Sequence, residues 1–333
     1  MGRVIRFKTP PLIAAAASAV GHEEHRGPYG EYFDFHDESD RFGSQTWEQA
    51  EGEMARTAFN LALKKRGISH ADVDLVLAGD LQNQCVASIM GASSFDIPFL
   101  GIYGACSTAV EGLLIGSYLL EAAGGPERVG VITSSHNCAA ERQFRLPIEY
   151  GGQRAPTAQW TATAAGAFLL EKKGVGVHIT AGMAGRIVDG GIKDATNMGA
   201  AMAPAACDSL LSYFKETGES PDDFDLVVTG DLGKEGSAIL FELCKEEGLF
   251  LEDLHFDCGA SLYNPTLQDA HAGASGCGCI AAMGASYFMR ALREGRHRRI
   301  LMMATGALMS PSSVQQGENI FGVAPIVVWE ADR

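Results

Sequence analysis

Two segments of the chain align with each other without a gap. Residues 71–81 read ADVDLVLAGDL and residues 222–232 read DDFDLVVTGDL. Each segment follows a stretch whose apolar residues recur with the period of a helix. A chance match of this length in the same local context is improbable, so the chain is predicted to consist of two duplicated βα halves, residues 1–170 and 171–333.

The match between the two halves continues further along the chain. Residues 116–118 (GSY) match residues 285–287 (ASY), and the strand pattern at 129–133 corresponds to that at 299–303. The spacing between the copies grows on the way, which predicts an insertion of about 18 residues near 248–268 in the second copy.

Strand and helix patterns alternate along both halves. Short apolar runs at 73–78, 129–133 and 164–170 are typical of buried strands. Longer stretches at 46–66 and 108–121 carry apolar residues on one face and end in glycine, as helices do. The alternation predicts a layered α/β fold.

One cysteine stands in a run of small residues, GIYGACSTA, at residues 101–109. A turn from a strand into the following helix would place Cys106 at a helix N-terminus, where free N–H groups and the macrodipole favour a thiolate and bind anions. The alternative is a buried and inert thiol, since free cysteine is among the most buried residue types. The spacing alone leaves both interpretations open.

Composition and charge exclude several classes of protein. The net charge of −15 argues against binding to bulk nucleic acid. No apolar run approaches the roughly 20 residues that span a bilayer, and no signal-peptide pattern is present, so any membrane contact is expected to be peripheral. The 8 cysteines show no metal-ligand spacing, and a chain of 333 residues does not need disulfides. These features favour a reducing, cytoplasmic setting.

Residues 21–44 mix glycine, proline, aromatic and acidic residues without a period, which predicts a long ordered loop or lid. The sequence HEEH at residues 22–25 lies inside this segment. It lacks the i, i+4 pair of histidines found in helical zinc sites, so no metal site is expected there.

A duplicated α/β chain with a cysteine at a strand-to-helix turn resembles the thiolase and ketosynthase superfamily. Residues 269–276 (DAHAGASG) are similar to a glycine-rich thiolase segment that carries a histidine, here one residue shorter and without its proline. The resemblance implies an αβαβα thiolase-like layered fold. It also implies that Cys106 occupies the nucleophile position and that His271 acts as a base or oxyanion donor.

Two departures from that superfamily bear on catalysis. Residues 304–309 (ATGALM) hold no cysteine, although thiolases carry a second cysteine at the comparable strand end. Asp231 stands where condensing enzymes of the ketosynthase III type place a histidine, and a carboxylate cannot polarise a carbonyl as a neutral imidazole does. We therefore expect a retained pocket with no catalytic residue, in which Cys106 is a relic nucleophile. The alternative is an active acyl-CoA-dependent acyltransferase of the thiolase or ketosynthase type that uses Cys106.

Over nearly its whole length the chain resembles one branch of the superfamily, the stage V sporulation protein AD family. The segments that carry this resemblance are GACSTA (104–109), SSHNCAAERQFR (134–145), QWTATAAG (159–166), HAGASGCGC (271–279) and TGALMSP (305–311). The resemblance implies non-catalytic binding of dipicolinic acid (pyridine-2,6-dicarboxylate) for uptake into the developing spore. It further implies membrane proteins of the same transport system as partners, a location in the cytoplasm or peripheral on the inner spore membrane, and a homodimer.

A small aromatic dianion needs an apolar slot and donors for its two carboxylates. The predicted ligand-binding residues are Asp80, Cys106, His136, Arg154 and His271, with Arg142 and Arg145 as further candidates. The net charge of −15 repels a free dianion, and chelated calcium would cancel that repulsion. We therefore expect the calcium chelate to bind, with Asp80 offering an oxygen to the metal. Calcium is expected only as part of the ligand, and no other cofactor is expected.

Overall fold

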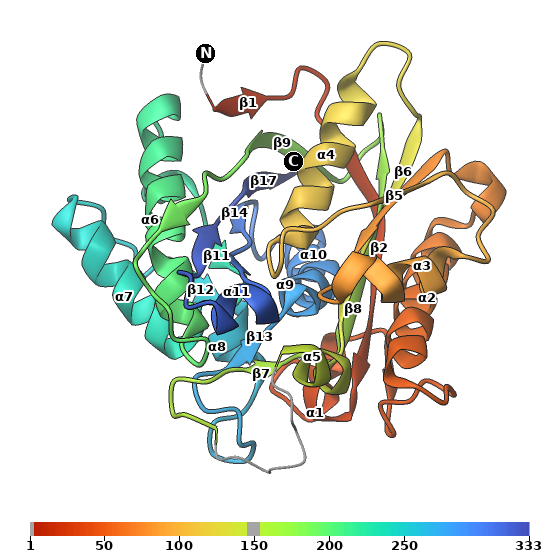
Figure 1. Ribbon diagram of the computed structural model, residues 1–333. Helices are drawn as coiled ribbons and strands as arrows, with labels where there is room; N and C mark the ends of the chain where they lie inside the picture. The colour runs from red at the N-terminus through yellow and green to blue at the C-terminus, as the bar shows by residue number, and fades with distance from the viewer. Residues whose placement is uncertain (1–2, 145–153, 333) are drawn as a thin grey trace.

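The computed structural model describes residues 3–144 and 154–332, and both halves of the chain contribute to one large sheet (Figure 1). The strand order across this sheet is β12-β11-β14-β17-β9-β2-β8-β6-β4-β5. The first half supplies β2 (Leu12–Gly21), β4 (Leu75–Gly79), β5 (Phe99–Gly101), β6 (Arg128–Ser135) and β8 (Ala164–Glu171). The second half supplies β9 (Val177–Met183), β11 (Leu226–Thr229), β12 (His255–Asp257), β14 (Arg299–Met303) and β17 (Ile326–Ala331).

The two halves have the same strand order when each is read from the centre of the sheet outwards. One half reads β2-β8-β6-β4-β5 and the other reads β9-β17-β14-β11-β12. In both, the outer three strands are parallel and the inner pairings are antiparallel. The inner strands β2 and β9 meet through the pair Leu12 and His178. This shared order confirms the duplication that the sequence predicts.

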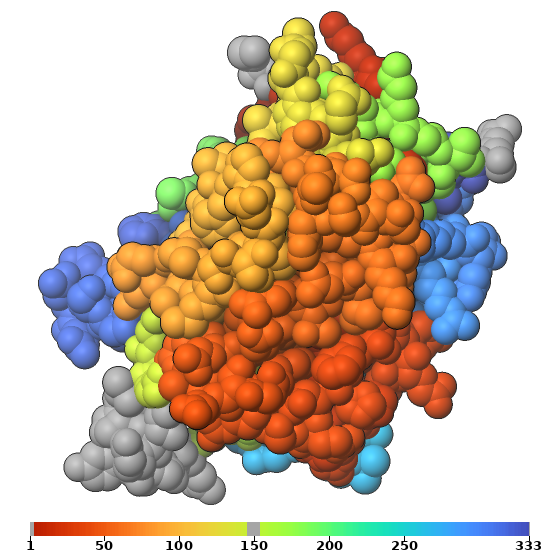
Figure 2. All heavy atoms as spheres, turned by 90° about the vertical axis from the view of Figure 1, so that its right-hand side faces the viewer, coloured from red at the N-terminus to blue at the C-terminus, as the bar shows by residue number. Residues whose placement is uncertain are grey.

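Helices complete the five layers of the fold. α2 (Trp47–Arg66) and α3 (Val86–Ala92) cover the outer face of the first half, which is the orange face in Figure 2. α6 (Met198–Thr217) and α7 (Gly233–Glu246) cover the outer face of the second half. Between the halves lie α4 (Thr108–Glu121) and a helix in three parts, α9 (Cys277–Met283), η6 (Gly284–Phe288) and α10 (Met289–Arg293). The chain therefore has the αβαβα thiolase-like arrangement.

The remaining elements are short. The strands are β1 (Val4–Arg6), β3 (Phe35–Asp37), β7 (Trp160–Thr161), β10 (Val188–Asp189), β13 (Ala274–Ser275), β15 (Gly306–Leu308) and β16 (Phe321–Val323). The helices are α1 (His22–His25), α5 (Asn137–Phe144), α8 (Cys258–Leu262), α11 (Pro311–Gln315), η1 (Gly30–Tyr32), η2 (His70–Asp72), η3 (Asn83–Cys85) and η5 (Pro221–Asp223). Within the two described ranges, no helix is both long enough and apolar enough to cross a membrane.

The helix predicted at 46–66 forms as α2 because both of its ends are capped. The hydroxyl of Thr46 accepts a hydrogen bond from the Gln49 N–H, and the Gln49 side chain accepts one from the Thr46 N–H. Gly67 ends the helix in the left-handed conformation, with φ of 76°. Gly130 lets β6 approach this helix, since a Cβ at that position would lie 2.7 Å from the ring of Phe59.

Residues 21–44 form an ordered segment, as their sequence predicts, but the predicted loop includes three short elements. They contain α1, η1 and β3, and β3 pairs in parallel with the end of β2. The buried carboxylate of Glu24 in α1 accepts hydrogen bonds from the Thr163 N–H at 3.0 Å and from the Tyr263 hydroxyl. These contacts join the segment to β8 and to the second half, and such long-range contacts leave no periodic signal in the sequence.

The additional residues of the second half are only partly where the repeat predicts them. α7 spans 14 residues, whereas its counterpart α3 spans 7. A further part of the insertion forms α8 and β13, and both of these elements lie between β12 and α9. The sequence predicts the whole insertion at 248–268. This placement follows from aligning the two copies at the strand before α7, where they still have the same spacing.

Candidate functional site

Cys106 lies in the turn between β5 and α4, as the sequence predicts. The Thr108 hydroxyl donates a 2.6 Å hydrogen bond to the Ala105 carbonyl, and Ala105 has a positive φ of 52°. Gly79 at the end of β4 makes room for this turn, because a Cβ there would lie 2.3 Å from the Ile102 carbonyl oxygen. The turn holds Cys106 in the interior, with 6% of the residue exposed.

A hydroxyl and a carboxylate from the second half face the Cys106 thiol. The Sγ of Cys106 lies 3.8 Å from the Oγ of Ser275 in β13. The Ser275 hydroxyl donates a 3.0 Å hydrogen bond to Asp231, which also accepts from the Gly276 N–H at 2.9 Å and from the Thr305 hydroxyl at 2.9 Å. The carboxylate of Asp231 is thus surrounded by donors, and the Ser275 hydroxyl links it to the thiol.

Burial and this carboxylate together disfavour a thiolate at Cys106. Burial is the largest cause, and the negative charge of Asp231 adds to it, so the pKa of the Cys106 thiol is raised well above its usual value. Hydrogen bonds with Ser275 and the Gly276 N–H lower that pKa but do not outweigh the first two causes. Of the two interpretations of Cys106, the structure shows the burial that the second predicts, and the raised pKa disfavours the thiolate that the first predicts.

A cavity of about 240 Å³ opens beside Cys106 and Ser275. The residues that line it come from α5, β7, β13 and β15, from the start of α6 and the segment before it, and from the turns after β4 and β5: Leu81, Tyr103, Ala105, Cys106, Ala140, Glu141, Phe144, Thr161, Ala195, Thr196, Met198, Ser275, Ala307 and Met309. Most of these side chains are apolar. Among the described lining residues the one charged side chain is that of Glu141.

Asp80 lies directly after β4, and its carboxylate turns into the first half. It accepts hydrogen bonds from the Gln82 N–H at 2.8 Å, from the Ser88 N–H at 2.8 Å and from the Ser88 hydroxyl at 2.5 Å. Burial raises the pKa of this carboxyl, and the Ser88 and Gln82 hydrogen bonds oppose the shift. Asp80 does not belong to the lining of the Cys106 cavity among the described residues.

The two predicted ligand histidines lie apart from each other. His136, at the start of α5, donates from Nε2 to the Asp40 carbonyl at 2.9 Å, while its Nδ1 accepts from the Cys138 N–H at 3.2 Å. Burial lowers the pKa of His136, in agreement with this neutral form. His271 contacts the Ala155 carbonyl through Nδ1 at 2.8 Å and the Asp269 carboxylate through Nε2 at 2.9 Å. Neither ring lines the Cys106 cavity.

The arginines predicted to bind carboxylates also have protein partners. Arg154 contacts the Asp269 carboxylate at 3.0 Å through Nη2, so Asp269 joins Arg154 to His271. Arg142 in α5 forms an ion pair with Glu48 in α2. Arg145 lies outside the described residues. The structure thus brings Arg154 and His271 together, but at a surface hollow separate from Cys106.

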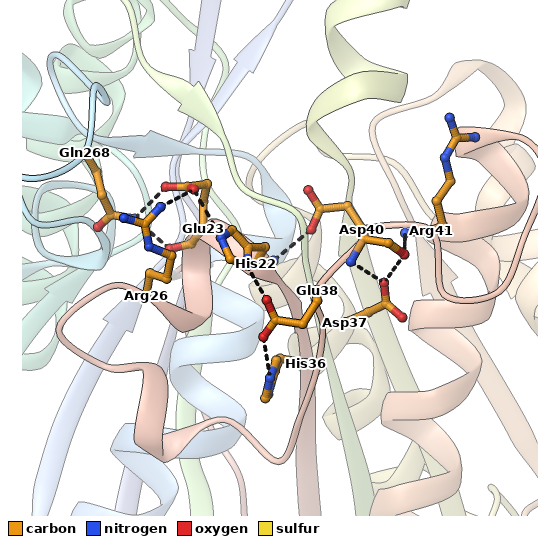
Figure 3. A network of polar contacts seen from close by, with 10 residues as sticks. His22, Glu23, Arg26, His36, Asp37, Glu38, Asp40, Arg41 and Gln268 are labelled. Carbon is orange, nitrogen blue, oxygen red and sulfur yellow. Dashed lines mark hydrogen bonds and ion pairs between the residues drawn. The ribbon is translucent and has the colours of Figure 1, made fainter.

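Of the two histidines in residues 22–25, His22 belongs to a network of polar contacts (Figure 3). His22 contacts the Glu38 carboxylate at 2.6 Å, and His36 contacts the other oxygen of Glu38 at 3.1 Å. The ring of His25 stacks on that of His36 with centroids 3.6 Å apart. No group of three or more potential metal ligands occurs among the described residues.

The sequence signal for the residues around Cys106 was only partial. The sequence places the carboxylate of Asp231 at the position of an imidazole, but it does not predict that Asp231 contacts the Cys106 site. Ser275 lies in the same glycine-rich segment as His271, yet Ser275 faces the thiol and His271 faces away. Thr305 follows β14 in the segment 304–309, where the resemblance to thiolases points to a missing cysteine and not to this hydroxyl.

Solved structures of condensing enzymes share this fold at low sequence identity. The structure of AbyA1, a tetronic acid condensing enzyme, matches with a TM-score of 0.61 and 17% identity over 96% of this chain and 99% of that chain. Cerulenin-bound OleA from Xanthomonas campestris matches with a TM-score of 0.62 and 15% identity over 97% and 98%. The 3-oxoacyl-[acyl-carrier-protein] synthase III of Aquifex aeolicus matches with a TM-score of 0.54 and 13% identity over 94% and 98%.

Sequence comparisons assign the chain to a family. A curated relative, the stage V sporulation protein AD of Bacillus subtilis (strain 168), is 42% identical over 324 residues, which cover 97% of this chain and 95% of the relative. The family model described as stage V sporulation protein AD matches residues 2–330. The chain therefore belongs to the stage V sporulation protein AD family.

Proposed function

We propose that this chain binds dipicolinate in the cavity beside Cys106 without transforming it, as the ligand-binding component of a system that takes dipicolinate up into the developing spore. Membership of the stage V sporulation protein AD family gives the chain a role in sporulation. Binding without catalysis is supported by a retained cavity of about 240 Å³, which lies beside a thiol that burial and Asp231 keep protonated.

The proposed absence of catalysis follows from the groups around the thiol. A cysteine nucleophile reacts as a thiolate, and an adjacent base or a lowered pKa produces that thiolate. At Cys106 the neighbouring ionisable group is the carboxylate of Asp231, which raises the pKa of the thiol. Acyl transfer by Cys106 is accordingly disfavoured.

The size and walls of the cavity favour a small flat ligand. Its volume of about 240 Å³ lies just below the roughly 300–1,000 Å³ of sites that hold drug-sized ligands. Leu81, Phe144 and Met198 supply apolar contacts for an aromatic ring. A pyridine ring with two carboxylates suits this volume better than a long acyl chain does.

The direction of the hydrogen bonds favours the calcium chelate over the free dianion. Ser275 and Thr305 both donate their hydroxyl protons to Asp231, so at this end of the cavity the Ser275 oxygen presents lone pairs. Glu141 adds a carboxylate to the wall, and the described lining includes no lysine, arginine or histidine. A bare dianion would find no hydroxyl donor in Ser275 there. Chelated calcium neutralises the ligand and prefers carboxylate oxygens, so we propose that calcium enters with the ligand and not as a resident cofactor.

Isothermal titration calorimetry tests this proposal. The chain is titrated with dipicolinate alone, with calcium alone and with the two together. We expect the chelate to bind at least as tightly as the free acid. Ala140→Leu, which fills the cavity, should weaken binding by at least about tenfold, whereas the exposed control Ala122→Leu should bind normally. Equal weakening in both variants, or weaker binding in the presence of calcium, would contradict the proposal.

The other predicted ligand residues can be examined in the same experiment. Because Arg154 and His271 lie away from the cavity, Arg154→Gln should leave the affinity unchanged if the cavity is the site. Asp80→Asn should act only indirectly, through the turn that Asp80 holds.

Incubation with acyl-CoA thioesters followed by mass spectrometry tests the acyltransferase alternative, and an acyl adduct on Cys106 would overturn the proposal of a non-catalytic site.

We further propose a homodimer that forms through the edge of the sheet at β5. β5 is the outermost strand on this side. Leu100 in β5 and Ile89 in α3 are each 51% exposed, and Tyr103, which lines the cavity, is 44% exposed. An exposed apolar sheet edge is a ready surface for pairing with a second chain. Membrane proteins of the same uptake system are the proposed partners, and the inner spore membrane is the proposed location.

A further inference from the structure

α6 and α7 run side by side on the outer face of the second half (Figure 1). Their backbones touch near their N-termini, where a Cβ on Gly199 would lie 2.8 Å from the Gly236 nitrogen and a Cβ on Gly236 would lie 2.8 Å from the Gly199 Cα. Glycines on both helices therefore allow a closer approach than the usual separation of about 8–10 Å between helix axes.

A cysteine follows each of these glycines at the same distance along its helix. Cys207 lies eight positions after Gly199, and Cys244 lies eight positions after Gly236. Positions i and i+8 share one stripe of a helix, about 12 Å apart along its axis. Because the two helices are in contact and in register, the two cysteines meet in one buried cluster, and each thiol shifts the pKa of the other.

The same two helices carry parts of the Cys106 cavity at their N-termini. Met198, the first residue of α6, lines the cavity. α7 begins at Gly233, two residues after Asp231, and the Leu232 and Gly233 N–H groups donate to Asp257 at 2.9 Å. A covalent link between α6 and α7 would therefore constrain both a wall of the cavity and the carboxylate beside the thiol.

We propose that Cys207 and Cys244 form a reversible disulfide that locks α6 to α7, with a low-molecular-weight disulfide as the oxidant. Both cysteines are free thiols in this structure. The cysteine pair is a redox-sensitive site distinct from Cys106, and its oxidation does not depend on the proposed ligand.

The two thiols are suited to different steps of this reaction. Cys207 is 7% exposed and Cys244 is fully buried, so an oxidant in solution reaches Cys207 first. Interaction with the neighbouring Cys244 thiol lowers the pKa of Cys207, although burial opposes this. The same interaction, together with burial, raises the pKa of Cys244. Cys207 is thus the attacking thiol and Cys244 the resolving thiol.

The reaction balances as two thiol–disulfide exchanges. The Cys207 thiolate attacks one sulfur of the small disulfide RSSR; the S–S bond breaks, a mixed disulfide forms on Cys207, and RS⁻ leaves and takes up the proton that Cys207 lost. Cys244 then loses its proton and attacks the Cys207 sulfur, which expels the second RS⁻. Overall the protein loses two electrons and two protons, and RSSR is reduced to two RSH.

Oxidised glutathione is the probe for this proposal, used on the full chain in its folded state. After incubation, the protein is digested without reduction and analysed by mass spectrometry. We expect a cross-linked peptide pair that contains Cys207 and Cys244, with a mass about 2 Da below the sum of the two peptides. The Tm should rise by about 5 °C, and dithiothreitol should reverse both changes.

Single-cysteine variants supply the controls. Cys207→Ser and Cys244→Ser should each abolish the cross-link and the rise in Tm, whereas Cys138→Ser, at a half-buried cysteine in α5, should retain both. If a variant fails to fold, the peptide map of the wild-type chain still decides the question. A glutathione adduct that stays on Cys207 without a cross-link, or thiols that remain unmodified, would overturn the proposal.

Discussion

Asp80 and Asp231 occupy matching positions in the two halves, after β4 and β11, but their carboxylates have different partners. Asp80 accepts hydrogen bonds from Ser88 and so holds the start of α3. Asp231 accepts instead from Ser275, whose hydroxyl lies 3.8 Å from the sulfur of Cys106. After the duplication, one aspartate stabilises a turn and the other sets the charge beside a thiol.

Removal of that charge should make Cys106 more reactive. Asp231→Asn eliminates the negative charge that raises the pKa of Cys106, so the pKa should fall and alkylation near neutral pH should accelerate by about tenfold for each unit. The rate of iodoacetamide labelling at Cys106, followed by peptide mass spectrometry as a function of pH, measures this effect.

Asp80→Asn is the matched control, since it makes the same chemical change at the equivalent position of the other half. Its partners are Gln82 and Ser88, so it should leave the labelling profile of Cys106 unchanged. A profile for Asp231→Asn that coincides with that of the wild type would show that burial alone sets the pKa of Cys106.

The fold was predictable because its signals are local or repeated. Thr46 and Gly67 mark the ends of α2, and small residues followed by an apolar stripe predict α4 with its observed bounds at Thr108 and Glu121. The matched segments at 71–81 and 222–232 predict two related halves, and the sheet has the same strand order in each. None of these inferences requires knowledge of which distant residues meet.

The site was less predictable because tertiary packing assembles it. Cys106 was identified from its own turn, but Ser275 reaches it only because β13 pairs with β7 and lies against that turn. The motif match predicts His271 as the site residue of this segment. His271 has a positive φ of 49° and lies in a turn that faces away from Cys106. The macrodipole argument for a thiolate is local, whereas burial and the charge of Asp231 outweigh it and depend on the whole fold.

Glu141 should distinguish the calcium chelate from free dipicolinate. Its carboxylate lies in the wall of the cavity and offers oxygen atoms of the kind that chelated calcium prefers and that a bare dianion cannot use. Glu141→Gln should therefore weaken binding of the chelate by about fivefold or more and leave binding of the free acid equal or tighter. Calorimetry with and without calcium measures both, and Glu318→Gln at an exposed position controls for net charge. Parallel weakening of both ligand forms would contradict a contact between Glu141 and calcium.

A charge placed on the exposed edge strand should prevent dimer formation. Leu100→Glu puts a carboxylate at a 51% exposed apolar position in β5, and burying an unpaired charge in an interface is unfavourable. Sedimentation velocity should report a dimer for the wild type and a monomer for this variant. Phe250→Glu, at a 64% exposed position after α7, should remain dimeric. A wild-type chain that is monomeric at all concentrations would exclude the interface.

The buried carboxyl of Glu24 should make stability depend on pH. Burial, partly offset by the Tyr263 and Thr163 hydrogen bonds, raises the pKa of Glu24 from 4.5 to about 7. Between these values the folded state binds more protons than the unfolded state, so this group lowers stability as the pH rises through that window.

Glu24→Gln removes this dependence because an amide does not titrate. Between pH 4 and pH 8, the free energy of unfolding of the variant should rise by about 3 kcal/mol relative to that of the wild type. This is an upper value, which follows from about 1.4 kcal/mol per unit of pKa shift. Denaturant unfolding at the two pH values measures the gain. A change in hydrogen bonding caused by the substitution is present at both pH values, so it cancels when the two measurements are subtracted. Glu31→Gln, at an exposed position, should show no such difference. If the gap between Glu24→Gln and the wild type is the same at both pH values, Glu24 is already ionised in the folded protein, and its contacts with Tyr263 and Thr163 compensate for its burial.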